Sequence, residues 1–314
     1  MDDFKLAKER MRMETLAYYN GRIDEIDKLT VPFNDRSHWF GDGVYDATCA
    51  ANHVIFALGE HIDRFFTSAD GVGIVLGISK QQLRALLQNL CKKVDSPCQL
   101  VYWQATRGGL TPRKHTFPRV GAPGQNDQPD GQAAPAANIW ASIVPTELSY
   151  AGMKKKLSLL SVEDTRYLHC GIKTLNLLPN VLAAERAQQA GCDEAVFHRG
   201  GRVAEGSHSN ISILKDGVFR TAPTDNLILP GVARAHLIRY CAELGIPVDE
   251  TAFTIDDLLC ADEAILSSAS KFCMAISSVD GRPVGGRAPE LLGRLQDTAA
   301  AHFMKETGYA TFRQ

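Results

Sequence analysis

Lys173 is a single cation in an otherwise apolar and small-residue stretch, Gly171-Ile172-Lys173-Thr174-Leu175-Asn176-Leu177-Leu178, just before a strongly helical segment at 183–188. A lysine in such surroundings either forms an ion pair with a buried carboxylate or is an amine whose pKa is lowered by desolvation. An amine of the second kind can form a Schiff base. A structural ion pair or a snorkelling stem is the commoner outcome for such lysines, so the rest of the sequence must decide.

A carboxylate and two small-residue turns follow this lysine in the chain. Glu205 stands at the end of a predicted strand, with small and polar residues after it, and glycine- or hydroxyl-bearing turns come at 230–234 and 267–270. A glycine before a helix exposes backbone N–H groups that can bind an anion. Arg64 can add a cation, although a surface ion pair with Glu60 is its ordinary use.

A desolvated lysine, a carboxylate and an anion-binding turn are the parts that hold pyridoxal phosphate. The amine forms the imine, the acid pairs with the protonated ring nitrogen, and the turns bind the phosphate together with Arg64. The spacing of these residues therefore indicates a pyridoxal phosphate site centred on Lys173.

Composition excludes several other classes of protein. The 34 basic and 36 acidic residues nearly balance, and no basic stripe with interleaved aromatic residues indicates a nucleic-acid partner. Apolar runs are interrupted well before the ~20 residues that a membrane helix needs. Eight scattered cysteines without a CxxC pair predict neither a metal site nor a disulfide framework. The charged N-terminus has no apolar core typical of a secretory signal, so we expect a cytoplasmic protein without metal.

The pattern of elements predicts an α+β fold of two domains, 1–147 and 148–314. In the first domain we expect an extra helix at 1–15, a flexible insertion at 119–137, and a linker at 145–156 toward the second domain. Its predicted elements are a hairpin at 16–23 around Asn20-Gly21, an alternating stretch at 47–58, strands at 30–33, 100–105 and 139–144, and helices beginning at 60 and at 80. Ser79 is the expected cap of the second helix.

The second domain is predicted to begin with an alternating strand at 156–162 and to carry Lys173. Its other predicted elements are strands at 194–198, 202–205, 210–215 and 263–267, and helices at 180–190, 234–244 and 289–306. The glycines of Phe40-Gly41-Asp42-Gly43 in the first domain are expected to allow positive φ or a close backbone approach.

Five motifs in the same order make a more specific signal than any one of them: FGDGVYD, EHIDR, IKTLNLLPNVLA, EAVFHRGGRVAEGSHSNI and LPGVAR. Together they resemble the fold-type IV family of pyridoxal phosphate-dependent aminotransferases, over roughly residues 16–285. The family includes D-amino acid aminotransferases, branched-chain aminotransferases and aminodeoxychorismate lyase. The resemblance implies a small N-terminal α/β domain and a larger C-terminal domain with a β-barrel-like sheet and helices.

The resemblance also implies roles for individual residues. Lys173 is the expected Schiff-base lysine and proton shuttle, Glu205 the partner of the ring nitrogen, and Arg64 a phosphate ligand. Tyr45 is expected to flank Lys173 and the substrate carboxylate, and Ala47 to lie on the substrate side of the same strand. The further cofactor-binding positions implied are Ser209, Asn210, Leu229, Val232, Ala233, Ala269 and Ser270. Relatives commonly carry a hydroxyl where this chain has Ala233 and Ala269.

The loop at 106–115 decides the subfamily. Arg113 and His115 resemble the carboxylate trap of D-amino acid aminotransferases, in which this loop reaches the active site of the neighbouring subunit of a homodimer. Arg113 could bind an α-carboxylate in bidentate fashion, with His115 and Tyr45 as further donors. The resemblance therefore implies ping-pong transamination between a D-amino acid such as D-alanine and 2-oxoglutarate or pyruvate.

Two alternatives stay open at this point. One is a related activity on the same fold: branched-chain L-amino acid or (R)-amine transamination, or chemistry like that of aminodeoxychorismate lyase. The other is a non-catalytic α+β binding protein, in which Lys173 only pairs with a carboxylate. Small amino and keto acids are the expected partners of the enzyme, with no nucleic acid and no membrane.

Overall fold

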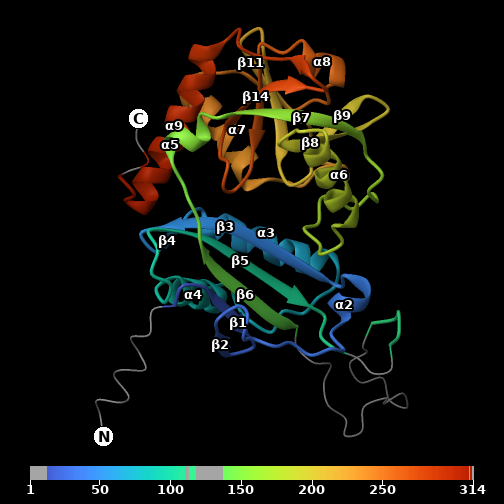
Figure 1. The fold of residues 1–314 in the computed structure, drawn as a ribbon, viewed down its shortest axis with the longest axis vertical. Helices are drawn as coiled ribbons and strands as arrows, with labels where there is room; N and C mark the ends of the chain where they lie inside the picture. The colour runs from blue at the N-terminus through green and yellow to red at the C-terminus, as the bar shows by residue number, and fades with distance from the viewer. Residues whose placement is uncertain (1–12, 110–112, 118–136, 311, 313–314) are drawn as a thin grey trace, which may run out of the picture. The chain divides into compact units, whose positions relative to one another are not determined.

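The computed structural model describes residues 13–109, 113–117, 137–310 and 312, and it divides the chain into two compact units (Figure 1). The first unit reaches Thr146 and includes Lys173–Asn176, whereas the second consists of Glu147–Ile172 and the chain from Leu177 onward. The predicted boundary after residue 147 falls one residue from this division. The lysine segment, which we expected within 148–314, is grouped with the first unit.

An antiparallel sheet of six strands forms the first unit, in the order β2-β1-β6-β5-β3-β4. The predicted hairpin around Asn20 and Gly21 is confirmed: both residues have positive φ and they connect β1 to β2. The strands are β1 (Leu16–Tyr19), β2 (Arg22–Asp24), β3 (Gly43–Ala51), β4 (Val54–Ile55), β5 (Cys98–Thr106) and β6 (Asn138–Pro145).

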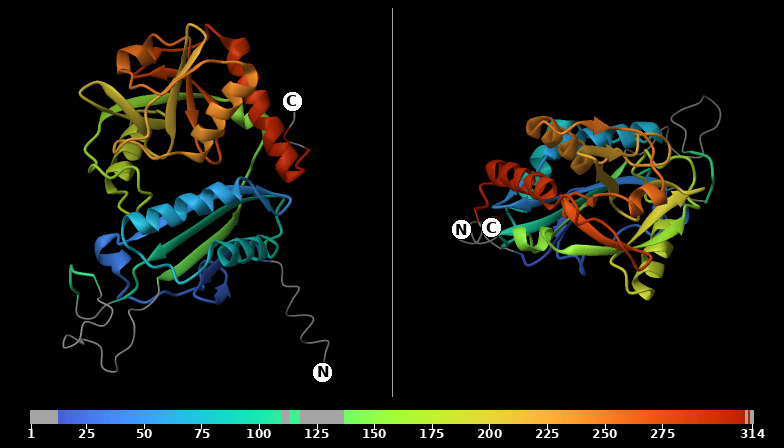
Figure 2. Two further views of the ribbon diagram at one scale, coloured as in Figure 1. Left: turned by 180° about the vertical axis from the view of Figure 1, so that it is seen from behind. Right: turned by 90° about the horizontal axis from the view of Figure 1, so that it is seen from above.

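Two helices, α3 (Leu58–Gly71) and α4 (Lys80–Cys91), cover the same face of this sheet (Figure 2). Phe65 of α3 lies 6.2 Å, centroid to centroid, from the indole of Trp103 in β5, and both side chains are fully buried. Ser79 caps α4 as predicted, since its Oγ accepts from the N–H of Gln82 and the Gln82 side chain accepts from the N–H of Ser79.

Two expectations for the first part of the chain were wrong. No strand forms at 30–33; instead α2 (Arg36–Phe40) follows, because Asp35 accepts a hydrogen bond from the N–H of Ser37 at 2.8 Å and starts a short helix. The described end of the helix predicted at 1–15 is not helical, since Met13 forms a β-bridge with Val94. The division between the two units, after Thr146, falls within the linker predicted at 145–156, which also contains α5 (Tyr150–Met153). The insertion predicted at 119–137 lies outside the described residues except for its last one.

The second unit is built on a curled, mixed sheet of nine strands that makes a half-barrel (Figure 1). Its path runs β12-β11-β10-β13-β14-β7-β8-β9, with β15 beside β14. The strands are β7 (Lys156–Glu163), β8 (Glu194–Arg199), β9 (Arg202–Gly206), β10 (Asn210–Lys215), β11 (Val218–Thr221), β12 (Val248–Asp249), β13 (Glu263–Ser267), β14 (Met274–Val279) and β15 (Arg282–Pro283). The fold therefore agrees with the class that the motifs implied.

Helices α6 (Leu178–Gln189), α7 (Val232–Leu244), α8 (Ile255–Leu259) and α9 (Pro289–Thr307) complete the second unit. Ala183 and Ala187 of α6 are buried against Phe197 of β8, in a core cluster with Val162 and Ile228. None of the described helices combines the length and the apolar character that a membrane span requires.

Candidate active site

The segment that carries Lys173 is fixed to the first strand of the site by backbone hydrogen bonds. The N–H of Tyr45 donates to the carbonyl of Lys173 at 2.9 Å, and the N–H of Leu175 donates to the carbonyl of Gly43 at 3.0 Å. The N–H of Lys173 itself donates to Oγ of Ser68, on α3, at 3.2 Å. These bonds hold the lysine against β3 and α3. They explain why the segment Lys173–Asn176, which is far from β3 in the sequence, is grouped with the first unit.

Glycine is needed at two positions for this close approach, as the sequence indicated. A Cβ on Gly43 would stand 2.6 Å from Cδ1 of Leu175 and 2.7 Å from the carbonyl oxygen of Ala105. Gly41 has a φ of 60°, and a Cβ there would stand 2.9 Å from Oδ1 of Asn176. A side chain at either glycine would displace the lysine segment.

Lys173 Nζ lies 4.4 Å from the centroid of the Tyr45 ring. On β3, Tyr45 and Ala47 share one face because strand residues alternate in direction. Tyr102 of β5 stacks on Tyr45 at 5.5 Å between ring centroids, and its hydroxyl donates to Oε1 of Gln104 at 2.7 Å. Burial, and then the nearby Tyr45, raise the pKa of Tyr102. The predicted lysine and tyrosine therefore meet on a face that also carries two polar residues the sequence did not single out.

Arg64 is held by a buried carboxylate from the neighbouring strand. Asp46 accepts from Arg64 Nε at 2.9 Å and from Nη2 at 2.7 Å, and its side chain is fully buried. Nδ1 of His61 lies 2.8 Å from Oδ1 of the same carboxylate. Arg64 is thus oriented by a strand residue that no sequence pattern singled out, rather than left to swing on the surface of α3.

The protonation states of this cluster follow from burial and charge. Burial on its own would raise the pKa of Asp46, but the charge of Arg64 and the hydrogen bonds from His61 and Arg64 bring that pKa below its usual range. Burial lowers the pKa of His61, and the positive charges of Arg64 and Lys173 lower it further against the opposing effect of Asp46. At neutral pH the cluster therefore consists of an aspartate anion, an arginine cation and a neutral histidine.

Arg113 and His115 are exposed, and both lie against Phe40 of α2. The guanidinium carbon of Arg113 stands 4.3 Å from the centroid of the Phe40 ring, and the imidazole of His115 stands 4.9 Å from it. A shared aromatic support keeps the two side chains of the predicted carboxylate trap close to each other. Residues 110–112, which precede them, lie outside the described part of the chain.

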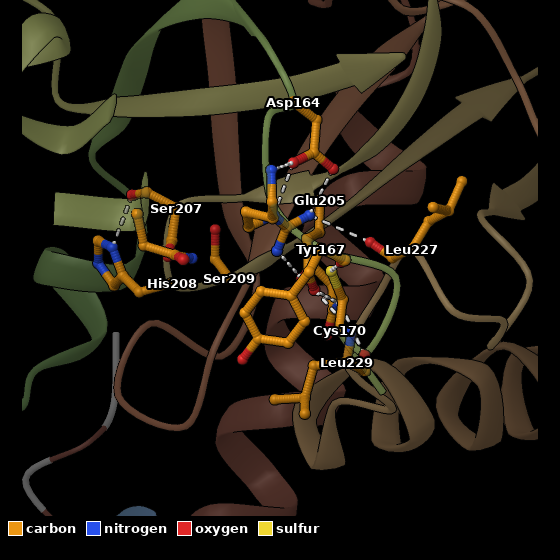
Figure 3. Close-up of polar contacts among 12 residues, drawn as sticks. Asp164, Tyr167, Cys170, Glu205, Ser207, His208, Ser209, Leu227 and Leu229 are labelled. Carbon is orange, nitrogen blue, oxygen red and sulfur yellow. Dashed lines mark hydrogen bonds and ion pairs between the residues drawn. The ribbon is translucent and has the colours of Figure 1, made fainter. Parts of the chain in front are cut away.

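In the second unit, Glu205 receives donors on both of its oxygens (Figure 3). Its Oε2 accepts from the backbone N–H of Leu229 at 2.9 Å and from Nδ2 of Asn210 at 3.1 Å. Its Oε1 accepts from Nη1 of Arg166 at 2.6 Å. Three of the predicted cofactor-binding residues are therefore brought together, and a fourth group, Arg166, is added to them.

Arg166 was missed by reasoning from the sequence, and so was Asp164, which binds it. Nε and Nη2 of Arg166 donate to the two oxygens of Asp164 at 2.9 and 3.0 Å, and Nη2 also reaches the carbonyl of Leu227 at 3.1 Å (Figure 3). Burial opposes the charge of Arg166, but its two carboxylate partners raise the pKa of the guanidinium above its ordinary value. The pattern Asp164-x-Arg166 after a strand was the available signal.

Gly231 precedes α7 and stands close to the same group. A Cβ on this glycine would overlap Oδ1 of Asn210. Among the described residues no side chain caps α7, so the backbone N–H groups of its first turn, which begins with Val232 and Ala233, are available for an anion. Ala269 and Ser270 lie in the turn that follows β13.

The hydroxyl of Ser209 forms a hydrogen bond with a buried carboxylate of its own unit. Its Oγ donates to Oε1 of Glu194 at 2.5 Å, and Oε2 of Glu194 accepts from Lys271 Nζ at 2.9 Å. His208 is exposed beside this pair, with Nε2 3.3 Å from Oε2 of Glu194. The hydroxyl predicted to contact the cofactor therefore also fixes the turn between β9 and β10.

No group of three or more metal-binding side chains occurs among the described residues. The sequence-predicted positions form two sets: Tyr45, Ala47, Arg64, Arg113, His115 and Lys173 in the first unit, and Glu205, Ser209, Asn210, Leu229, Val232, Ala233, Ala269 and Ser270 in the second. Each set contains a reactive or charged centre with a fixed environment.

Residues 43–279 match the amino-transferase class IV family. The D-alanine aminotransferase of Listeria monocytogenes serotype 4b (strain F2365) is 40% identical over 273 residues, which make 86% of this chain and 90% of that protein. The D-alanine aminotransferase of Bacillus licheniformis is 34% identical over 281 residues, 90% of this chain and 94% of that one.

Among solved structures, the branched-chain amino acid aminotransferase from Escherichia coli superposes with a TM-score of 0.77 at 22% identity. The superposition covers 95% of this chain and 96% of that one, and at this identity it shows the fold alone. The family match and the two curated relatives span most of the sequence. This chain therefore belongs to the class IV aminotransferases.

Proposed function

We propose that this aminotransferase moves the amino group of a D-amino acid, with D-alanine as a representative donor, to a 2-keto acid such as 2-oxoglutarate or pyruvate. The two D-alanine aminotransferases that are 40% and 34% identical over most of their length support this specificity. The structural observation that carries it is the common support of Arg113 and His115 on Phe40. An arginine and an imidazole so paired suit an α-carboxylate.

The enzyme uses pyridoxal phosphate, as class IV aminotransferases do. When bound, this cofactor supplies an aldehyde that condenses with amines and a ring that accepts the electron pair left when the substrate loses its Cα proton. The residues present fit the cofactor. Three N–H donors stabilise the negative charge of Glu205, and a carboxylate so held suits a protonated ring nitrogen.

Each of the two sets of residues contains donors that suit a phosphate group. In the first unit, Arg64 offers a guanidinium whose orientation Asp46 fixes. In the second, the first turn of α7 after Gly231 offers backbone N–H groups without a side-chain cap. We assign the remaining cofactor contacts to Ser209, Ala269 and Ser270. Because Ala233 and Ala269 lack hydroxyls, Arg64 and the backbone amides carry most of the phosphate binding in this proposal.

Lys173 performs the proton transfer. Its Nζ would hold the cofactor before substrate arrives, and the same amine would carry the proton from the substrate Cα to the cofactor C4′. Tyr45, whose ring lies 4.4 Å from Nζ, limits where the amine can move. Glu205 keeps the proton on the ring nitrogen throughout. Release of the first keto acid and entry of the second make the two halves of a ping-pong reaction, which run in opposite directions.

We also propose a homodimer in which the loop with Arg113 and His115 reaches the active site of the neighbouring subunit. A cytoplasmic location belongs to the same proposal. It is supported by the eight cysteines, all of which are free thiols in the structure, since thiols persist in a reducing compartment. Ala47 is small and leaves room for the substrate side chain.

A panel of amino donors in both enantiomers, with 2-oxoglutarate as acceptor, tests the specificity by keto-acid formation. We expect turnover of D-alanine and none of L-leucine or of an (R)-amine without a carboxylate. Turnover of only the L-amino acid would replace this proposal by branched-chain transamination, and turnover of the (R)-amine by amine transamination. Formation of pyruvate from aminodeoxychorismate would instead indicate lyase chemistry.

The role of Lys173 has a separate test. Borohydride reduction of the cofactor-loaded enzyme should attach the pyridoxyl group to Lys173, as read by peptide mass. Lys173→Ala should abolish turnover and the attachment. Lys80→Ala is the matched control, because Lys80 Nζ pairs with the exposed carboxylate of Asp63 and lies over the ring of Phe66, at the surface. Label on another lysine, or turnover by Lys173→Ala without added amine, would refute the assignment.

A further inference from the structure

Arg36, the first residue of α2, contacts both described arms of the loop that carries Arg113 and His115. Its backbone N–H donates to the carbonyl of Gly108 at 2.9 Å, on the arm that leaves β5. Its guanidinium reaches three consecutive carbonyls on the other arm: Nη1 donates to Lys114 at 2.6 Å and to Thr116 at 3.3 Å, and Nη2 donates to His115 at 3.2 Å. One residue therefore fixes the backbone of the loop at both ends.

The charge of Arg36 is balanced within the same cluster. Its Nε donates to Oδ2 of Asp42 at 2.7 Å, and Arg36 is only 2% exposed. Asp42 also accepts from Nε of Arg107, whose other nitrogens donate to the carbonyls of Val72 and Gly73. Two guanidinium groups thus share one carboxylate. The remaining N–H groups of Arg36 are directed to the loop carbonyls, because a buried guanidinium must satisfy its donors.

The same short helix supports the side chains of the loop. Phe40 is four residues after Arg36 and therefore lies on the same face of α2. Its ring contacts the guanidinium groups of Arg36 and Arg113 and the imidazole of His115. Arg36 holds the backbone between Arg113 and Thr116, and Phe40 holds the side chains that project from it.

We propose that Arg36 is a positioning residue for substrate recognition: it fixes the loop backbone so that Arg113 and His115 meet the α-carboxylate in one geometry. The inference rests on the proposed role of these two residues. Bidentate recognition of a carboxylate tolerates displacements of only about 0.5 Å. Arg36 touches neither Lys173 nor Arg64 in the contacts described, so its loss should affect substrate binding more than the chemical step.

The variant Arg36→Lys tests this role in the cofactor-loaded enzyme. Lysine keeps the positive charge and can pair with Asp42, but its single ammonium cannot donate along a fork to three carbonyls. We expect KM for D-alanine and for the keto acid to rise about 10-fold, the effect of roughly 1.4 kcal/mol in binding. The value of kcat and the visible spectrum of the bound cofactor should stay close to those of the wild type.

Arg22→Lys is the matched control, since the guanidinium of Arg22 also donates to a backbone carbonyl, that of Thr30 at 2.7 Å, but at an exposed site away from the loop. It should leave KM unchanged. If Arg36→Lys is insoluble, Arg36→Gln, which keeps two N–H donors without charge, is measured in the same way. Failure of both variants to fold would show a purely structural role and overturn the proposal.

A double-mutant cycle shows whether Arg36 acts through the carboxylate trap. Once Arg113→Ala has removed the trap, Arg36→Lys should add little further to KM. Independent, multiplicative effects would overturn the proposal, and so would an unchanged KM in Arg36→Lys or an equal loss of kcat and cofactor. Should the donor panel show that the wild type accepts only L-amino acids, the proposed function fails. In that case the ratio of KM between Arg36→Lys and the wild type, measured with the L-amino acid, still decides the role of Arg36. An enzyme without any transaminase activity would refute both the proposed function and the role of Arg36.

Discussion

Asp46 binds the guanidinium of Arg64 through two hydrogen bonds, from Nε at 2.9 Å and from Nη2 at 2.7 Å. The pair joins β3 to α3, and the carboxylate is completely buried. A bidentate pair of this kind fixes the plane of the guanidinium as well as its position. The direction of Arg64 is therefore set by the fold before any anion reaches it, which is the condition for tight phosphate binding at small entropic cost.

Asp46→Asn should destabilise the enzyme and weaken its hold on the cofactor together. Removing one partner of a buried ion pair costs about 3–5 kcal/mol because the other charge stays buried without compensation. We therefore expect a lower urea midpoint and a higher dissociation constant for pyridoxal phosphate. Asp63→Asn, next to Arg64 on α3 but in an exposed pair with Lys80, is the control and should change neither. Unchanged cofactor affinity in Asp46→Asn would separate Arg64 from phosphate binding.

His61 should make the stability of the enzyme depend on pH between about 7 and 5.5. Burial holds the pKa of His61 below the 6.5 of a free histidine. Below pH 6.5 the unfolded chain therefore gains a proton that the folded protein lacks. The stability present above that pH is lost as pH falls toward the lower folded pKa, at up to ~1.4 kcal/mol per pH unit. Asp46, whose pKa is lowered from 3.8, titrates below this window.

Urea titrations at several pH values measure this contribution. His61→Gln should flatten the dependence of the unfolding free energy on pH between 7 and 5.5, relative to the wild type. Equal slopes for the wild type and His61→Gln would show that His61 titrates in the folded enzyme as it does in the unfolded chain.

Glu205→Gln should slow the chemical step without releasing the cofactor. An amide cannot stabilise a positive charge on the ring nitrogen as the carboxylate does, so we expect kcat to fall about 10²–10³-fold, in the range found when one electrostatic contact to a transition state is removed. Glu205 accepts from Arg166 and from Leu229 through its two carboxylate oxygens, and glutamine keeps only one side-chain oxygen. Rapid-mixing kinetics with D-alanine would measure the step directly.

Glu263→Gln is the control for that substitution, because Glu263 is also buried in the second unit and accepts from backbone N–H groups, those of Gly286 and Ala288. It should lower stability but leave kcat nearly unchanged. If both variants lose kcat alike, the effect of Glu205→Gln is a general consequence of disturbing the unit, and the assigned role is wrong.

Long elements and the glycines at a close backbone approach were predictable from the sequence. Apolar spacing predicted a helix beginning at 60, and Ser79 predicted the cap of a helix beginning at 80; α3 and α4 were found there. Glycines 41 and 43 were expected at a close approach, and each meets the segment that carries Lys173. These features depend on neighbours in the sequence or on one backbone contact, which is why local patterns reveal them.

Partners that come together only in the folded chain were not predictable in this way. Arg64 was expected to pair with Glu60 or to bind phosphate, yet it is held by Asp46, which lies 18 residues earlier on another element. Arg166 follows β7 and Glu205 lies in β9, and the two residues meet only because both strands pair with β8 in one sheet. Helix α2 was missed because five residues are too few for a periodic signal, and its start depends on Asp35.

Two glycine-to-alanine substitutions in the second unit should affect different properties. The first should affect cofactor binding and kcat, and the second only the free energy of unfolding. The φ of Gly231 is −68°, which alanine adopts without strain, so the effect of Gly231→Ala is purely steric: the new Cβ would overlap Oδ1 of Asn210. Asn210 donates to Glu205 and to the carbonyl of Leu229. Displacing it should weaken cofactor binding and reduce kcat, as read by cofactor titration and steady-state kinetics.

Gly293 lies inside α9, and a Cβ there would meet no atom within 4 Å. Gly293→Ala should raise the free energy of unfolding by about 0.5–1 kcal/mol, because alanine loses less backbone entropy in a helix, and it should leave kcat and cofactor affinity unchanged. Comparing Gly231→Ala with Gly293→Ala separates the steric overlap with Asn210 from the general effect of replacing a glycine. If Gly231→Ala binds the cofactor as tightly as the wild type, the approach of Gly231 to Asn210 has no part in holding it, and the phosphate must depend on other donors.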